Sequence, residues 1–208
     1  MPRQTFFNLP PEKQKRLLNA IHDEFSRVPF NEVSINQIVQ LAGIPRGSFY
    51  QYFENKQDML EYLLSDYQTM LGRSALESLK QTGGDLFQMF VHILDFSYEF
   101  VNEERNNAFC KNIFSDISVI TYFLHQQFGG KPLGGLAEEL IPCINMDLLD
   151  INSEEDFENM LGILLPLTGE TFARVFFDTS NYEINRSRYA ARLELLKQGF
   201  LKEKGASK

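Results

Sequence analysis

Apolar residues recur at intervals of three and four positions along almost the whole of this 208-residue chain. This spacing is the period of a helix that buries one face, and no alternation of apolar and polar residues is long enough to predict a sheet. The sequence therefore predicts an all-α fold. Its length is sufficient for one or two domains with buried cores.

Proline, glycine and capping residues set the expected helix boundaries. Pro11 suits the first turn of an opening helix that Pro29 ends, and Ser153 followed by Asp156 predicts the start of a later helix. Pro166 is expected to kink that later helix. The helices expected beyond the N-terminal region cover 57–80, 85–104, 107–114, 116–128, 153–177 and 182–202, and short helices and loops are expected over 129–152.

Two short helices joined by a glycine turn are predicted within the first 56 residues. Ser34 opens the first of them with Gln37 three positions later, which is the spacing of a capping box. Gly43 supplies the left-handed residue that ends it, and Pro45 begins the second helix, which ends near Tyr52. With the preceding helix they form a helix-turn-helix of the kind that places its last helix in the DNA major groove. A purely structural three-helix head has the same spacing, so both interpretations stand at this point.

Charge is distributed unevenly along the sequence. Residues 1–56 hold seven basic and five acidic side chains, whereas the net charge of the whole chain is −8 at pH 7. The N-terminal part therefore carries +2, and residues 57–208 carry −10. Because phosphate contacts require lysine and arginine, this asymmetry indicates one region able to approach a polyanion and another that is repelled by it.

The residues around the glycine turn resemble the signature of the TetR family. Segments 34–39 and 41–56 carry this resemblance, and the positions that stand at the family's spacing include Ala42, Gly43, Gly47, Tyr50, Phe53 and Lys56. The resemblance is close over about residues 10–60, and the remainder is similar only as a helical domain of suitable length. It implies a helix-turn-helix DNA-binding domain at 1–56 and a larger helical domain at 57–208 for regulation, ligand binding and dimerisation.

The same resemblance implies a ligand-responsive transcriptional regulator. We expect a repressor that binds double-stranded, palindromic operator DNA and is released by a small, largely apolar effector. Aromatic residues are unusually dense between positions 85 and 130, which suits an apolar or aromatic compound. Each aromatic residue by itself also fits ordinary core packing. The ligand-binding residues are therefore left unknown, as are the operator and the effector.

Spacing along the third helix separates a reading face from a packing face. Arg46 and Tyr50 are four residues apart and share one side, whereas Phe49 and Phe53 share another. Arg46 can offer a bidentate fork to guanine, and Tyr50 can contact a thymine methyl group or a phosphate. Gly47 lets a DNA backbone approach closely. The full set of residues expected to contact DNA is Ser34, Arg46, Gly47, Ser48, Tyr50, Gln51, Tyr52 and Lys56.

Two of these assignments concern phosphate contacts. The family resemblance implies that Lys56 clamps a phosphate at the start of the next helix, assisted by the helix dipole. Ser34 is expected to add a phosphate contact or to serve only as a helix cap. The structural alternative is a solvated surface charge for Arg46 and a packing residue for Tyr50. For Lys56 it is an ion pair with Glu54 or Asp58.

A homodimer is expected because one head contacts only a half-site, and two heads engage successive major grooves about 34–36 Å apart. The last two helices are expected to form a four-helix interface with their copies, since large apolar residues recur there at heptad-like spacing. The residues expected at this interface are Leu161, Leu164, Tyr189, Leu193, Leu196 and Phe200. Packing of these stripes within a single subunit is the alternative.

The remaining features argue against several other classes of protein. No nucleophile stands beside a recognisable base, so neither an enzyme nor a cofactor is expected. Cys110 and Cys143 have no second cysteine or histidine at ligand spacing, which argues against a metal site or a disulfide. No apolar run approaches the roughly 20 residues of a membrane span, and a cytoplasmic protein is expected. An all-helical enzyme, or an interaction protein with a vestigial DNA-binding head, remains the alternative function.

Overall fold

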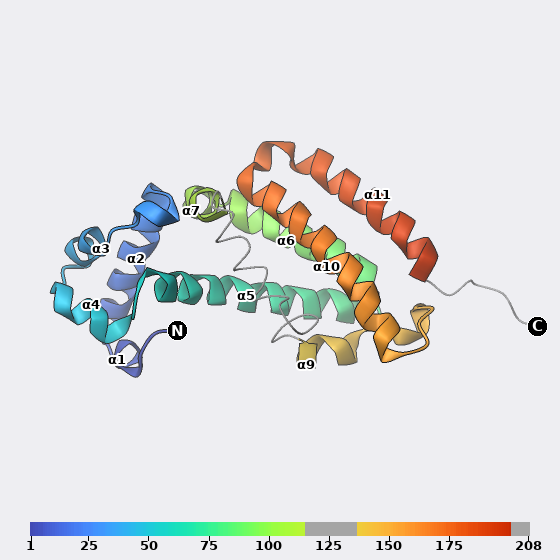
Figure 1. Ribbon diagram of the computed structural model, residues 1–208, viewed down its shortest axis with the longest axis horizontal. Helices are drawn as coiled ribbons and strands as arrows, with labels where there is room; N and C mark the ends of the chain where they lie inside the picture. The colour runs from blue at the N-terminus through green and yellow to red at the C-terminus, as the bar shows by residue number, and fades with distance from the viewer. Residues whose placement is uncertain (115–136, 201–208) are drawn as a thin grey trace, which may run out of the picture. The chain divides into compact units, whose positions relative to one another are not determined.

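The computed structural model describes residues 1–114 and 137–200, and every regular element in these two stretches is a helix (Figure 1). This confirms the expected all-α fold. The α-helices are α1 (Gln4–Phe7), α2 (Pro11–Arg27), α3 (Ile35–Ala42), α4 (Arg46–Tyr52), α5 (Lys56–Gln81), α6 (Leu86–Asn102), α7 (Glu104–Phe114), α9 (Ala137–Leu140), α10 (Glu154–Phe177) and α11 (Tyr182–Phe200). The 3-10 helices are η1 (Phe30–Glu32), η3 (Ile141–Cys143), η4 (Met146–Leu148) and η5 (Thr179–Asn181). The helix expected over 116–128 lies outside the described residues.

The chain forms two compact units. The first comprises Met1–Met70 with Glu103–Ile117, and the second comprises Leu71–Asn102 with Ser118–Lys208. Helix α5 contributes its N-terminal part to the first unit and its C-terminal part to the second. The expected boundary between domains 1–56 and 57–208 falls in the first turn of α5, and this division of the chain stays a prediction.

The first unit is built around α2, which packs against α3 and α7. Helix α2 buries an apolar face because its large side chains recur with helical spacing, and Leu17, Ile21 and Phe25 are almost inaccessible to solvent. Further buried side chains from α3, α4 and α5 complete this core: Ile38, Val39, Ala42, Phe49, Phe53, Met59 and Leu60. The short helices α3 and α4 are thus held by burial rather than by their own length.

Helix α3 is capped differently from the capping box expected at Ser34. Ser34 is the N-cap residue and has an extended backbone, but its side chain makes no capping hydrogen bond. Its backbone N–H donates instead to Oε1 of Glu24, at 2.9 Å. Glu24 is fully buried at the end of α2, and Nε and Nη2 of Arg27 also donate to its carboxylate. The far end of α3 follows the expectation, since Gly43 is left-handed with φ +63°.

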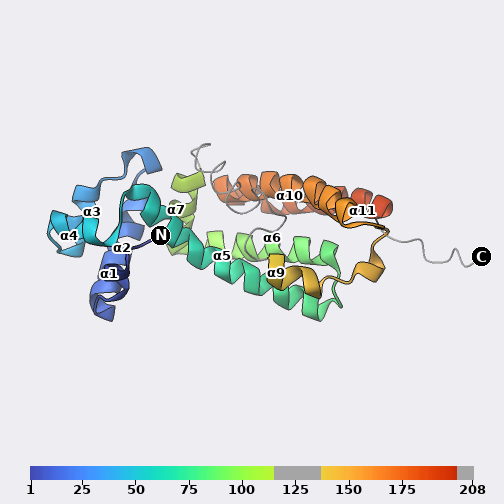
Figure 2. The ribbon, with the colours of Figure 1, turned by 60° about the horizontal axis from the view of Figure 1, so that its bottom comes forward.

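The second unit places α6 against both α10 and α11, which also pack against each other (Figure 2). Its core contains the apolar faces of these helices, including Phe90, Leu94, Leu164 and Tyr189. The hydroxyl groups of Tyr189 and Thr168 are hydrogen-bonded at 2.7 Å and join α11 to α10. These two buried hydroxyl groups are therefore satisfied.

Helix α10 begins as expected, because the Ser153 hydroxyl accepts a hydrogen bond from the N–H of Asp156 at 3.1 Å. It continues through Pro166 to Phe177. Within the described residues it is the one helix long and apolar enough to cross a membrane by length and composition, and 56% of that apolar stretch is buried inside the protein. Burial of this kind is typical of the core helix of a globular domain.

Candidate nucleic-acid interface

Helix α4 turns one side into the core and leaves the other exposed. Phe49 is fully buried and stacks on Phe53, with their ring centroids 5.9 Å apart. Arg46, Gly47 and Tyr50 lie on the exposed side. Gln51 is exposed as well, whereas Ser48 and Tyr52 are half-buried. The seven-residue helix is thus anchored by a phenylalanine and presents polar groups to a partner.

Arg46 is the first residue of α4 and reaches across to α3. Its Nη1 donates to Oδ1 of Asn36 at 2.6 Å. This hydrogen bond orients the guanidinium group and leaves most of its five N–H donors for a partner. Sequence reasoning missed Asn36, because a residue ten positions upstream on another helix has no periodic relation to Arg46.

Gly47 lies in open space on the surface of α4. A Cβ atom built at this position would meet no atom of the described residues within 4 Å. The fold itself therefore does not require a glycine here. Any requirement for the missing side chain must come from a molecule that approaches α4 from outside.

Lys56, the first residue of α5, has partners other than the neighbouring acids. Its Nζ donates to the backbone oxygens of Phe30 at 3.1 Å and of Asn31 at 3.0 Å, and it lies 4.9 Å from the centre of the Phe30 ring. The carboxylate of Asp58 accepts from the N–H of Glu54 instead, at 3.0 Å. An ammonium group has three N–H donors. Lys56 therefore holds the turn before α3 and keeps one donor for another acceptor.

The segment before α2 closes the C-terminal end of α4, which the sequence did not indicate. The N–H of Arg3 donates to the carbonyl of Tyr52 at 2.8 Å, and the Thr5 hydroxyl donates to the carbonyl of Gln51. Phe6 is fully buried, with its ring centroid 5.1 Å from that of Phe53. The last carbonyls of α4 would otherwise lack partners within the helix. Residues 3–6 thus act as its C-terminal cap.

Helices α2 and α7 meet around a histidine with an unsatisfied nitrogen. The His22 ring stacks on Phe109 at 5.0 Å, and its buried Nε2 has no hydrogen-bond partner within residues 1–114 and 137–200. Burial lowers the pKa of His22, and the positive charge of Arg105 lowers it further, against smaller opposing effects of Asp23 and Asn106. His22 is therefore neutral in the folded protein near neutral pH.

Comparison with known protein families agrees with this geometry. Residues 17–63 match the model of bacterial regulatory proteins of the tetR family, and residues 85–200 match a tetracyclin repressor-like C-terminal domain. The chain belongs to the TetR family of transcriptional regulators. The two matches together cover both the helix-turn-helix and the larger helical domain.

Individual relatives of this TetR-family regulator are distant. The HTH-type transcriptional regulator YdgC of Bacillus subtilis is 28% identical over 120 residues, which are 56% of each chain. The chain thus spans about half the length of the curated relatives it matches.

Two solved structures share the fold. The dihydroxyacetone kinase operon activator DhaS has a TM-score of 0.60 and 18% identity, covering 91% of this chain and 98% of its own. NalD, a secondary repressor of the MexAB-OprM efflux pump in Pseudomonas aeruginosa, has a TM-score of 0.57 and 17% identity, covering 93% and 98%.

Most of the residues expected at the dimer interface of this TetR-family regulator are buried within the single chain. Leu161, Leu164, Tyr189 and Leu193 are at most 3% exposed. Leu196 is half-buried, and the side chain of Phe200 lies outside the description. Other apolar residues of α10 and α11 are exposed instead, namely Ile163, Phe177, Ile184 and Leu195. Helical periodicity identified the apolar helices but not the side that remains open.

Some of the aromatic residues expected around an apolar effector are also buried in the core, and others lie outside the described residues. Phe87, Phe90 and Phe109 are buried in the cores of their units. The side chains expected from position 114 to position 128 lie outside the described residues. The second unit contains a cavity of about 370 Å³ between α5, α6 and α11, and of the expected aromatic side chains that the structure describes, only Phe87 lines it.

Proposed function

We propose that this TetR-family protein is a ligand-responsive repressor that binds a palindromic operator as a homodimer. The observation that carries the proposal is the two-sided character of α4, in which Phe49 is fully buried while Arg46 and Tyr50 are exposed. A short helix anchored in this way can enter the major groove without losing its core contacts. The residues proposed to contact DNA remain Ser34, Arg46, Gly47, Ser48, Tyr50, Gln51, Tyr52 and Lys56.

The proposed roles differ among these residues. We assign base recognition to the exposed guanidinium of Arg46 and phosphate contact to the remaining donor of Lys56. The hydroxyl of Ser34 makes no capping hydrogen bond to α3. We therefore assign it a phosphate contact. The excess of basic residues in 1–56 favours approach to DNA through this domain, and the acidic remainder disfavours any other contact.

The dimer is proposed to form through the exposed stripes of α10 and α11. On α11, Ile184 and Leu195 lie eleven residues apart on the side that also exposes Ala191. Glu170 of α10 and Arg192 of α11 are paired at 3.4 Å and join the two helices beside these stripes. Two such helix pairs related by a two-fold axis form a four-helix interface. This placement replaces the buried leucines expected from the sequence.

Repression is the mode that we propose. NalD is a repressor and DhaS an operon activator, so this fold serves both modes. Occupation of an operator by two heads is sufficient to exclude other proteins from the same DNA. The effector is proposed to be small and largely apolar, and the protein is placed in the cytoplasm, where operator DNA lies. A catalytic role is not proposed, since the family consists of DNA-binding regulators.

Footprinting with the purified protein on the promoters of neighbouring genes, followed by affinity measurements on the protected fragment, tests the proposal. We expect a protected palindrome and an affinity that falls steeply as salt rises. Transcription in vitro from that promoter should decrease when the protein is added. Absence of any protected sequence would instead favour the interaction protein with a vestigial head.

A further inference from the structure

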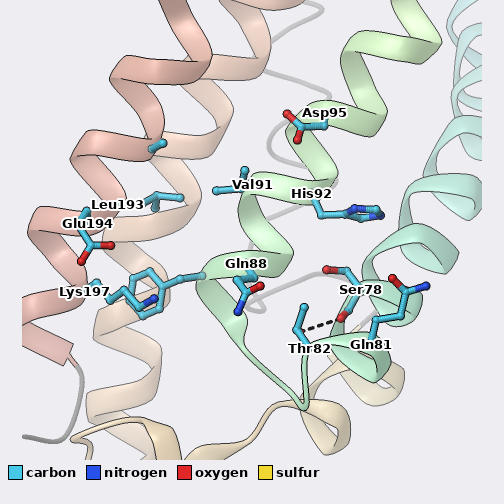
Figure 3. A pocket seen from close by; sticks show the side chains of 12 residues that line it. Ser78, Gln81, Thr82, Gln88, Val91, His92, Asp95, Leu193, Glu194 and Lys197 are labelled. Atoms are coloured by element: carbon cyan, nitrogen blue, oxygen red, sulfur yellow. Dashed lines mark hydrogen bonds between the residues drawn. The ribbon is translucent and has the colours of Figure 1, made fainter. Parts of the chain in front are cut away.

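The cavity of the second unit lies between the C-terminal end of α5, the middle of α6 and α11 (Figure 3). Its volume of about 370 Å³ falls within the range of about 300–1,000 Å³ that is common for small-molecule sites. Figure 3 shows the side chains of α5 on one side, those of α11 on the other and Gln88 of α6 between them. The cavity is therefore a solvent-open hollow bordered by three helices of one compact unit.

The floor of the cavity is apolar. Phe87 and Leu193 are both only 3% exposed, and Nζ of Lys197 lies over the Phe87 ring, 5.9 Å from its centre. The half-buried Val91 therefore provides the accessible part of this apolar surface. An apolar floor of this kind favours a ligand with a face of C–H groups. It cannot satisfy a hydrogen-bonding group turned toward it.

Hydrogen-bonding groups stand beside this floor. Ser78 is 3% exposed and lines the cavity with its hydroxyl-bearing side chain. The side-chain nitrogen of Gln88 donates to Oδ2 of Asp85 at 2.8 Å, which leaves its carbonyl oxygen as an acceptor. A hydroxyl group is the complement of such a pair, since it donates to the Gln88 oxygen and accepts from a donor such as Ser78.

The charged groups at the cavity are largely neutralised by partners. Asp95 receives hydrogen bonds from Arg186 at 2.7 and 2.8 Å. Burial alone would raise the pKa of Asp95, but the bonds from Arg186 and Tyr182 outweigh it and lower that pKa. Nζ of Lys197 lies 3.9 Å from Oδ2 of Asp85 and forms an ion pair with it. Because Glu194 adds a carboxylate at the rim, an anionic ligand would be repelled.

We propose that this cavity binds an uncharged, ring-sized molecule with several hydroxyl groups, such as a monosaccharide. The ring's C–H face lies on Val91, beside the buried Phe87 and Leu193, and its hydroxyl groups bond to Ser78 and Gln88. This site is additional to the apolar effector proposed above, and its occupation does not depend on DNA binding.

The cavity and the proposed dimer surface use different sides of α11. Ala190, Leu193 and Lys197 line the cavity, whereas Ile184 and Leu195 belong to the exposed stripe. At 100° per residue these two sets point roughly 155° apart around the helix. A ligand can therefore enter while α11 is engaged in a dimer.

Ligand-observed NMR with the purified full-length protein tests the site with three probes of similar size: glucose, glucuronate and cyclohexanol. Glucose should bind with a dissociation constant in the millimolar range. Glucuronate, which carries a negative charge, and cyclohexanol, which has a single hydroxyl group, should both bind at least about tenfold more weakly. Equal binding of all three probes, or no binding of glucose, would overturn the proposal.

Three variants test whether glucose binds in the cavity. Ala190→Phe fills it from α11 and should abolish glucose binding, whereas Ser187→Phe adds the same ring at an exposed position of α11 outside the cavity and should leave it unchanged. Gln88→Leu removes the acceptor at nearly constant size and should weaken glucose binding about three- to tenfold. Melting temperatures of the variants identify any failure to fold. Glucose binding that survives Ala190→Phe in a folded protein would contradict the assignment, while operator binding is measured separately.

Discussion

Arg46 is the side chain on which base recognition is proposed to depend. Arg46→Ala removes a possible bidentate contact and should weaken operator binding by about 1–3 kcal/mol and relax the preference at one base pair. Fluorescence anisotropy with the footprinted operator and its single-base variants measures both effects. Asn36→Ala is the matched control, because it removes only the 2.6 Å bond that orients Arg46 and should lower affinity with the preference retained. Unchanged affinity and preference in Arg46→Ala would show that the reading face is misassigned.

Lys56 combines a structural and a proposed binding role in one ammonium group. Lys56→Met keeps the aliphatic stem over Phe30 but loses the hydrogen bonds to the carbonyls of Phe30 and Asn31. The free energy of unfolding should fall by about 1–3 kcal/mol. Binding to all DNA sequences should weaken alike, and the salt slope should decrease by about one. Lys13→Met, at an exposed position of α2, should do neither, and a sequence-selective loss in Lys56→Met would contradict the phosphate role.

His22 gives stability a dependence on pH near neutrality. Because burial lowers its pKa below the ordinary value of 6.5, the unfolded chain takes up a proton that the folded chain refuses. The contribution of His22 to the free energy of unfolding is therefore fully present above pH 6.5, and it is lost as the pH falls below that value. Urea unfolding at about pH 7.5 and about pH 5.5 should show a smaller loss in His22→Phe than in the unchanged protein. A His22→Phe variant that loses as much stability between these pH values as the unchanged protein would contradict this role of His22.

At the scale of elements, α4 depends on the segment that precedes α2. Thr5→Val keeps the shape of the side chain but removes the hydrogen bond to the Gln51 carbonyl at the end of α4. We expect a several-fold loss of operator affinity at unchanged base preference, because the helix end frays while the reading residues remain. Anisotropy titrations measure this loss. Thr69→Val serves as the control, since the Thr69 hydroxyl bonds only within α5; an equal loss there would contradict the specific role of Thr5.

The sequence predicted those elements whose signals are local. Gly43 and Pro45 fixed the turn between α3 and α4, because a left-handed residue and a missing N–H act within a few positions. The cap of α3 by Glu24 and the closure of α4 by Thr5 join residues ten and 46 positions apart. Periodicity carries no information about such pairs. The proposed DNA contacts could be named from the motif, but their supports could not.

A related limit applies to α10 and α11. Helical spacing showed that each has an apolar face, yet both helices are apolar on more than one side. The sequence pattern does not say whether another helix of the same chain covers a given leucine. Leu193 is covered within the chain at 3% exposure, whereas Leu195, two residues later, is 70% exposed. Only the exposed fractions of the two side chains in the folded protein distinguish Leu193 from Leu195.

At the scale of the whole molecule, operator binding is proposed to require two chains. Replacing Ile184 and Leu195 together by glutamate places charge on the exposed stripe of α11 and should give a folded monomer that no longer binds the palindrome. Light scattering and circular dichroism measure assembly and folding. The matched control replaces Met146 and Leu148, which are the exposed first and last residues of η4, by glutamate and should remain dimeric. A variant of the stripe that stays dimeric and binds the operator would refute this interface.

The buried carboxylate of Glu24 has a consequence for protein engineering. Helices α3 and α4 have eight and seven residues, and helices of this length are unstable in isolation. The N-terminus of α3 receives its hydrogen-bond acceptor from α2 rather than from its own serine. A transplant of residues 34–53 into another scaffold would therefore carry the reading residues without the group that orders them. The smallest portable cassette therefore contains α2 and also residues 3–6, which close the end of α4, and specificity grafts between such regulators should exchange α1, α2, α3 and α4 together.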